Sequence, residues 1–236
     1  GDGTLAALKG YMENDGVALS INAPIATRPE QVISINRKMV EHNKIPSNVI
    51  CFGTMHPLFG KSGNVEEELE YLAENGIKGI KMHTEYQEFY PDDGKLGRIY
   101  RACVKNGLII LFHAGADAAY DFESTHGTPK RFAAMLKAFP DLKAVLAHMG
   151  GFRMWDQVYR EIAGKNVYFD TAYSSEMEDS VFKGLVAAHG AGRVVFGTDF
   201  PWERASVIID KVKKNVENEA DREKIFHLNA EKLLGL

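Results

Sequence analysis

Hydrophobic and polar positions follow two alternating patterns along the chain. Seven short runs are largely apolar and rich in β-branched residues, and they cover residues 17–23, 48–55, 79–82, 108–112, 144–147, 167–169 and 194–196. Such runs are typical of strands that are buried on both faces, as in a parallel sheet. Longer segments with helical periodicity lie between them. We therefore predict seven parallel β-strands, with helices in the connections.

The intervening segments carry the start and stop signals of helices. Asn64 precedes an acidic stretch that suits the positive end of a helix dipole, and Thr128 followed by Pro129 predicts another helix start. Asn-Gly pairs at 75–76 and 106–107 predict helix ends. Each strand-plus-helix unit spans roughly 25 to 35 residues, as a right-handed βαβ crossover requires.

This alternation runs over residues 1–236 without a linker or a low-complexity tract, so we predict a single domain. A TIM barrel and an open doubly wound sheet both produce such alternation. No Gly-x-Gly-x-x-Gly motif follows the first predicted strand, which argues against a dinucleotide-binding sheet. The favoured prediction is an α/β fold of the TIM (β/α)8 barrel type.

The strand count has a consequence for this barrel. A helix-like segment at residues 5–14 precedes the first predicted strand, so the chain begins on a helix that no strand leads into. We therefore expect that the first barrel strand, N-terminal to Gly1, is missing and that the domain is N-terminally incomplete. A barrel without one strand has two open edges, so a gap is expected between the runs at 17–23 and 194–196.

Composition excludes several classes of partner. The net charge is −4, and no basic run indicates a nucleic acid or a membrane surface as partner. No apolar stretch reaches 18 residues. The two cysteines, Cys51 and Cys103, lie in apolar segments without metal-site spacing, which predicts buried thiols and a cytoplasmic location. We expect a small-molecule substrate and leave the oligomeric state open, with a homo-oligomer among the alternatives.

Three polar residues terminate apolar runs in the same way. His113, His148 and Asp199 each follow a predicted strand and are flanked by small residues. In a barrel, the C-terminal strand ends face one mouth, where active sites are built. A single histidine of this kind is more often a hydrogen-bonded structural residue, but three such positions together favour function. Imidazoles and a carboxylate that converge suit a divalent metal such as zinc.

Four segments resemble the amidohydrolase-related family, which includes the aminocarboxymuconate-semialdehyde decarboxylase-like enzymes. They read Phe-His-Ala-Gly at 112–115, Ala-His-Met-Gly-Gly at 147–151, Phe-Gly-Thr-Asp-Phe-Pro at 196–201 and Asn-Ala-Glu-Lys-Leu-Leu-Gly-Leu at 229–236. The resemblance implies a TIM barrel with a divalent metal, His113 and Asp199 as metal ligands, and His148 as a catalytic histidine. The family's His-x-His pair, which belongs to the first strand, does not occur in this sequence. Two ligands rarely hold zinc tightly, so a metal-free chain is one alternative.

Further candidates lie near the predicted mouth. Lys81 ends the third predicted strand and suits an anchor for a substrate carboxylate, with a carbamylated metal-bridging lysine as the alternative. His83 is expected to line the mouth, and Arg153 to pair with a carboxylate. Trp202 is expected to wall an apolar pocket. For each of these three residues, an ordinary loop, surface or packing role is the competing interpretation.

These residues predict metal-assisted catalysis on a small carboxylated molecule. Asp199 would ligate the metal and shuttle a proton, while His148 would orient the nucleophile. Hydrolysis of an amide, ester or lactone is the first choice, and non-oxidative decarboxylation is the alternative. A non-catalytic, metal-free barrel that binds a metabolite or a partner is the competing class.

Overall fold

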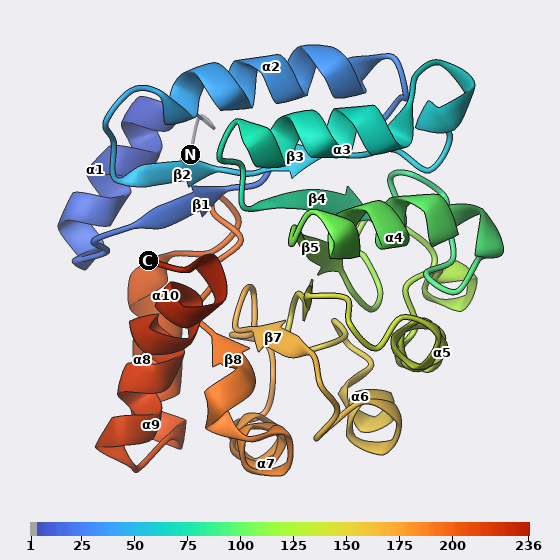
Figure 1. Cartoon of the computed structure of the whole chain (residues 1–236). Helices are drawn as coiled ribbons and strands as arrows, with labels where there is room; N and C mark the ends of the chain where they lie inside the picture. Colours follow the sequence, from blue (N-terminus) through green and yellow to red (C-terminus); the bar gives the residue numbers. More distant parts are fainter. Residues whose placement is uncertain (1–3) are drawn as a thin grey trace.

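The computed structural model describes residues 4–236, and parallel strands form its centre (Figure 1). The strands are β1 (Ser20–Asn22), β2 (Val49–Cys51), β3 (Gly53–Thr54), β4 (Gly79–His83), β5 (Ile109–His113), β6 (Ala144–Leu146), β7 (Tyr168–Asp170) and β8 (Val194–Val195). β1 pairs with β2, and β3 to β8 pair in sequence order, all in parallel. β2 and β3 occupy one apolar run that is interrupted at Phe52. The seven predicted strands are therefore confirmed, with one of them split in two.

Helices cover the outer face of these strands (Figure 1). They are α1 (Leu5–Asp15), α2 (Gln31–Asn43), α3 (Val65–Glu74), α4 (Gly97–Lys105), α5 (Pro129–Ala138), α6 (Trp155–Glu161), α7 (Asp179–His189), α8 (Ala205–Asn215), α9 (Glu219–Glu223) and α10 (Asn229–Leu234). Short 3-10 turns occupy Phe59–Lys61, Gly94–Leu96, Phe122–Ser124 and Ala191–Arg193, and a π-helical turn spans Lys224–Leu228. The chain thus has the α/β organisation of a (β/α) barrel.

The helices begin and end at the predicted residues, but one predicted capping hydrogen bond is not formed. The side chain of Asn64 accepts hydrogen bonds from the backbone N–H groups of Glu66 and Glu67, so it caps α3. Pro129 begins α5, but the side chain of Thr128 makes no capping hydrogen bond there. At the end of α4, Gly107 adopts a left-handed φ of 67°, which a residue without Cβ reaches at no steric cost.

Alternate residues of each strand face opposite sides of the sheet, which decides what reaches the barrel interior. On β5, Ile110 and Phe112 pack in the large core between strands and helices. Ile109 and Leu111 pack instead in the small cluster inside the barrel, with Val145 and Leu234 among their neighbours. The same alternation turns His113, the last residue of β5, toward the interior.

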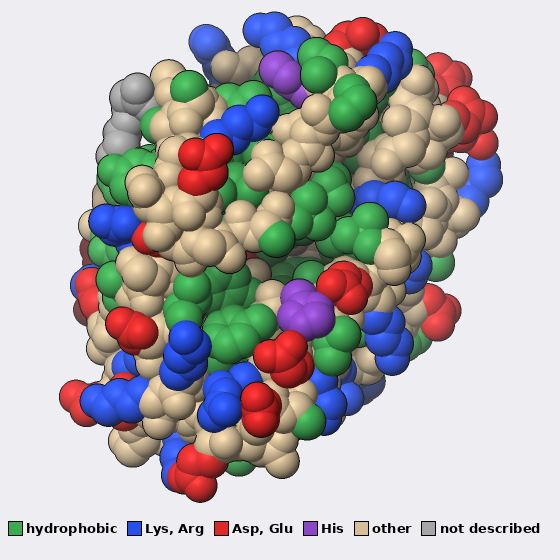
Figure 2. Space-filling view, turned by 90° about the vertical axis from the view of Figure 1, so that its left-hand side faces the viewer, with side chains coloured by type: hydrophobic (Ala, Val, Ile, Leu, Met, Phe, Trp, Pro, Cys, Tyr) green, Lys and Arg blue, Asp and Glu red, His purple; other side chains and the backbone are tan. Residues whose placement is uncertain are grey.

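The barrel is open between its first and last strands. Within the described residues, β1 pairs only with β2, and β8 pairs only with β7, so the predicted gap is confirmed. A cavity of about 1430 Å³ runs from the strand ends into this gap and touches α1, α8 and α10. Apolar side chains line its walls, among them Leu8, Ile21 and Leu234. Figure 2 shows the hollow on this side of the molecule, with hydrophobic side chains around it.

Two smaller observations complete the fold. Cys51 and Cys103 are free and buried, as their apolar sequence contexts predict. Within residues 4–236, no helix has both the length and the apolar character needed to cross a membrane.

Candidate functional site

The C-terminal strand ends bring a group of polar side chains to the wall of the large cavity. β4 contributes Lys81 and His83, β5 contributes His113, and His148 follows β6 by two residues. His83 and His113 are direct partners in the parallel register of β4 and β5. Asp199, four residues beyond β8, lines the same cavity. The three residues that the strand-end pattern singled out therefore share one cavity.

Aromatic rings form a column beside these strand ends. The ring of Tyr86 stacks on that of His83 with centroids 3.8 Å apart, and His83 stacks on His113 at 4.0 Å. The ring of His148 meets His113 edge-on at 4.9 Å. Stacking fixes the orientation of each imidazole, so its nitrogens point in defined directions.

The hydrogen bonds of His113 and His148 assign their protons. His113 Nε2 lies 3.0 Å from the carbonyl oxygen of Ala116, and His148 Nδ1 lies 3.0 Å from that of Ala172. A carbonyl only accepts, so each of these nitrogens carries the hydrogen. The remaining nitrogens, His113 Nδ1 and His148 Nε2, face each other at 3.1 Å. Two neutral rings would oppose lone pairs there, so this point favours a proton or a metal ion.

The two ring nitrogens of His83 have different partners. Its Nδ1 accepts the backbone N–H of Tyr86 at 3.3 Å, so its Nε2 carries the hydrogen in the neutral ring. That Nε2 lies 3.5 Å from Oδ2 of Asp117, a residue in the loop after β5. As the side chains stand, His83 and Asp117 form a weakly coupled imidazole–carboxylate pair.

Burial favours the uncharged form of His83 and His113. It lowers the pKa of His83 to about 2, and the nearby Lys81 and His148 act in the same direction. Burial also holds the pKa of His113 well below its usual range, with His83 as the next cause. Because only the neutral ring has a free lone pair, these imidazoles are in the form that binds metals.

Lys81 lies inside the barrel, and part of its side chain faces the cavity. Burial lowers the pKa of its ammonium group, and the carboxylates of Asp199 and Asp170 oppose that shift. A lysine surrounded in this way lacks the hydration that it would have at the surface. An anionic ligand that enters the cavity would add to the negative charge that these two carboxylates provide.

Asp170 belongs to the site although the sequence did not point to it. It ends β7, and its Oδ1 accepts the backbone N–H groups of His148 at 2.8 Å and Ala172 at 3.0 Å. Burial raises the pKa of this carboxyl group, which those hydrogen bonds oppose. Asp170 ends an apolar strand just as His113 does, and this signal was missed because the predicted run stopped at Phe169.

Several of these residues hold unusual backbone conformations. His148, Met149 and Asp199 have φ values of 59°, 55° and 61°, in the left-handed region that residues with a Cβ rarely adopt. Asp170 stabilises two of them, because its carbonyl oxygen also accepts the N–H of Met149 at 2.7 Å. Conformations of this kind cluster at functional sites.

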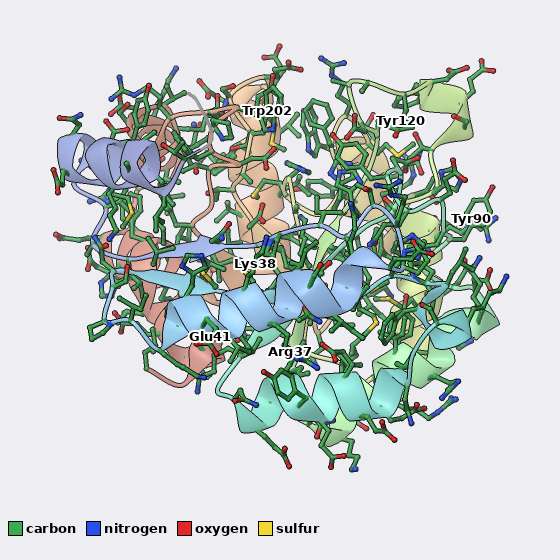
Figure 3. All side chains as sticks on the ribbon, turned by 90° about the horizontal axis from the view of Figure 1, so that it is seen from above. Arg37, Lys38, Glu41, Tyr90, Tyr120 and Trp202 are labelled. Atoms are coloured by element: carbon green, nitrogen blue, oxygen red, sulfur yellow. The ribbon has the colours of Figure 1, made fainter. Side chains whose placement is uncertain are left out.

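The remaining sequence candidates divide into two groups. Trp202 lines the cavity and is 74% exposed, on the side of the molecule where Tyr120 also lies (Figure 3). Arg153 is not among the residues that line the cavity, so its role toward a substrate carboxylate stays a prediction. Its guanidinium donates two hydrogen bonds to Oε2 of Glu176, at 3.0 and 2.7 Å. This ion pair leaves Arg153 engaged at the surface.

The donor set fits a divalent metal. Among the described residues, His83, His113 and Asp117 offer ligand atoms that lie within 4.8 Å of one another. The lone pairs of His113 Nδ1 and His148 Nε2 add a point that calls for positive charge. Imidazole nitrogen and carboxylate oxygen are ligands that zinc and manganese both accept.

Comparisons with known proteins agree with the fold. A family model described as amidohydrolase matches residues 24–236. A Dictyostelium discoideum protein named 2-amino-3-carboxymuconate-6-semialdehyde decarboxylase is 23% identical over 270 residues, covering 99% of this chain and 71% of that protein.

Solved structures give the same picture. A 5-carboxyvanillate decarboxylase from Novosphingobium aromaticivorans, complexed with manganese and 4-hydroxy-3-methoxy-5-nitrobenzoic acid, superposes with a TM-score of 0.77 at 19% identity, covering 98% of this chain and 80% of that chain. A 2,6-dihydroxybenzoate decarboxylase complexed with 2,6-dihydroxybenzoate has a TM-score of 0.75 at 18% identity, covering 99% of this chain and 88% of that chain. At these identities, the likeness concerns the fold.

Proposed function

The chain belongs to the amidohydrolase family, and from this premise we propose that it is a metal-dependent decarboxylase of small carboxylated aromatic or unsaturated molecules. From the sequence we expected hydrolysis first, with decarboxylation as the alternative. The relatives reverse that order, because the curated relative and the superposed enzymes described above are named decarboxylases. With either reaction, the chain is an enzyme of the amidohydrolase superfamily.

One observation carries the proposal: Lys81 lies beside neutral imidazoles on the wall of a cavity with largely apolar lining. A carboxylated planar molecule matches this cavity, since its ring can contact apolar walls while its carboxylate meets the cation. Apolar surroundings strengthen that electrostatic contact, because the effective dielectric constant is lower than in water.

We propose that His113 and Asp199, the ligand pair that the family resemblance implies, would hold the metal, rather than the cluster of His83, His113 and Asp117. A divalent ion bound there would polarise a substrate oxygen and draw electron density from the reacting carbon. Zinc was the metal expected from the sequence, and the manganese in a superposed relative makes manganese the first to test. His148 Nε2 faces the same point and is proposed to accept a hydrogen bond from water or substrate.

The chain's own residues would then handle the carboxylate and the proton. Lys81 binds the substrate carboxylate and orients the ring. The carbon–carbon bond to the carboxylate breaks, its electron pair stays on the ring carbon, and CO₂ leaves. Asp199 delivers a proton to that carbon and is reprotonated from solvent. One proton is consumed for each CO₂ released, so the step is balanced.

The test is CO₂ release from 2,6-dihydroxybenzoate and 5-carboxyvanillate by the manganese-loaded protein. Lys81→Met should lower kcat/KM by about 100-fold, the usual scale for a charge-assisted contact in a buried site. Lys78→Met is the matched control, because Lys78 is exposed, precedes the same strand and does not line the cavity. Hydrolysis of amides or lactones without any CO₂ release would identify a hydrolase instead. Binding without turnover of either substrate class would favour the non-catalytic interpretation.

A further inference from the structure

We propose that Asp117 selects ligands that carry a hydrogen-bond donor, a hydroxyl or amino group, on the same small molecule as the carboxylate. This inference rests on the proposed function for its carboxylated ligand, and it adds the residue that recognises the second polar group. Neither the family motifs in the sequence nor the strand-end pattern points to Asp117.

The geometry leaves Asp117 with unused acceptor capacity. Its side chain is only 11% exposed and lines the cavity together with Lys81. Oδ1 accepts the backbone N–H of Ala119 at 2.8 Å. Oδ2 has His83 Nε2 at 3.5 Å, which is too long for a strong hydrogen bond. A carboxylate oxygen accepts more than one hydrogen bond, so Oδ2 can take a donor from a ligand in the cavity.

The loop that carries Asp117 is held at both ends. Glu85 is buried, and its Oε1 accepts the backbone N–H groups of His126 at 2.9 Å and Gly127 at 3.2 Å. Its Oε2 lies 2.6 Å from Nδ1 of His126. Gly127 in turn accepts the N–H of Gly115 at 2.8 Å, which closes the loop at its base. A residue presented by an anchored loop keeps a defined position, as selection between similar ligands requires.

Close packing also fixes the start of the loop. A Cβ on Gly115 would lie 2.1 Å from the backbone nitrogen of Phe152, so no other residue fits there without a backbone shift. Farther along the loop, the ring of Tyr120 contacts that of Tyr86, with centroids 5.9 Å apart. Between these contacts, Ala116 is buried and Asp117 is partly buried at the cavity wall, whereas residues 118–120 are exposed.

The charges on the cavity wall explain why the ligand needs a hydrogen-bond donor. Lys81 and Asp117 place opposite charges on the wall of the same cavity. A ligand that brings only a carboxylate satisfies Lys81 but displaces water from Asp117, which leaves Oδ2 with no donor nearer than His83 Nε2 at 3.5 Å. Such an unsatisfied group costs more than the hydrogen bond contributes when it is made, so ligands without a donor are rejected.

The experiment compares two ligands that differ in one hydrogen-bond donor. We would titrate the manganese-loaded protein with 2-hydroxybenzoate and with 2-methoxybenzoate in a calorimeter. The wild-type protein should bind the hydroxylated compound about 10-fold or more tightly, the scale of a hydrogen bond to a charged group. In Asp117→Asn, Oδ1 can still accept the N–H of Ala119 while an NH₂ group replaces Oδ2. The preference should then fall to about 2-fold or less.

Asp121→Asn is the matched control. Asp121 lies in the same loop, and its Oδ1 likewise accepts a backbone N–H, from Glu123 at 3.1 Å, but it does not line the cavity. This variant should keep the wild-type preference. Elemental analysis of bound manganese accompanies each titration. If Asp117→Asn loses its manganese, Asp117 is a metal ligand and the inference is wrong.

The outcomes separate this inference from the decarboxylase proposal, since binding needs no turnover. If the preference depends on Asp117 but no CO₂ is released from hydroxylated benzoates, the inference stands and the proposed reaction fails. If CO₂ is released but Asp117→Asn keeps the wild-type preference, the inference is overturned. A wild-type protein that binds 2-methoxybenzoate as tightly as 2-hydroxybenzoate, or that binds neither compound, overturns it as well.

Discussion

At the scale of single residues, proton positions decide what the site can do. His113 Nε2 and His148 Nδ1 each donate to a backbone carbonyl, and the other nitrogens of the two rings face each other 3.1 Å apart. Two lone pairs opposed at this distance would repel each other, so a proton or a cation at this point would stabilise the pair. The carboxylate of Asp170 accepts a hydrogen bond from the backbone N–H of His148. The hydrogen bonding of these histidines thus depends on residues that are distant in the sequence.

Three substitutions should separate the roles of the proposed site residues. His113→Ala removes a metal-binding nitrogen, so bound metal and CO₂ release should fall together. Asp199→Asn should weaken metal binding and also abolish proton delivery, because an amide does not return a proton. His148→Ala should keep most of the metal and lower turnover by roughly 100-fold, the usual scale for a positioned acid–base group.

Elemental analysis beside kinetics decides among these roles. If His148→Ala loses metal as completely as His113→Ala, then His148 is a ligand. If all three variants keep metal and activity, the site lies elsewhere.

At the scale of elements, short polar links join strands to helices. His189, the last residue of α7, donates from Nε2 to the carbonyl oxygen of Val167 at 2.9 Å. Its Nδ1 accepts the N–H of Gly164 at 3.1 Å, and its ring stacks on Phe169 at 3.7 Å. Both nitrogens are satisfied only while the ring is neutral. Protonation would set a second N–H against that of Gly164.

This link predicts a loss of stability in acid. Burial lowers the pKa of His189 from 6.5 to about 4 in the folded protein. Between these values the unfolded chain binds the extra proton, so the free energy of unfolding falls as the pH drops from 6.5 to 4. At about 1.4 kcal/mol per pKa unit, the contribution is about 3 kcal/mol. Urea unfolding at about pH 7, 5.5 and 4.5 would measure it.

His189→Gln is the comparison variant for this prediction. Its amide can donate to Val167 and accept from Gly164, but it does not titrate. Its stability should therefore change less over the same pH range than that of the wild-type protein. Equal pH dependence of the two proteins would contradict the assignment.

At the scale of the whole molecule, the open side of the barrel distinguishes its strands. β4 and β5 have hydrogen-bonded neighbours on both sides, whereas β1 and β8 each pair with one strand among the described residues. The cavity reaches the gap between β1 and β8, so water has access to their free edges. Local opening should thus cost less free energy at these two strands than at the centre.

Amide hydrogen exchange would measure this difference. Backbone amides of residues 109–113 should exchange most slowly, and those of residues 20–22 and 194–195 should exchange faster by about 10-fold or more, which corresponds to about 1.4 kcal/mol in opening free energy. Mass spectrometry of peptides that cover these segments provides the rates. Equal protection of β1 and β5 would show that the gap is closed in solution.

The sequence alone determined the order of the elements. Strand runs, the Asn64 cap and the gap between β1 and β8 followed from local periodicity, capping chemistry and a strand count. Those signals are local because side-chain direction repeats every two residues in a strand. For the same reason, the apolar runs that end at His113 and His148 were enough to nominate both histidines as site residues.

Only the tertiary structure decided which polar groups meet. Asp117 reaches His83 because the loop that carries it is tied down at His126 by Glu85, a residue of a different strand-to-helix connection. Arg153 is as well suited to a substrate carboxylate by its residue type, but the fold places Glu176 against its guanidinium. A loop follows no periodic pattern, and its course depends on long-range hydrogen bonds whose partners lie in other elements. That is why the strand-end histidines could be predicted, while Asp117, which a loop brings to the cavity, could not.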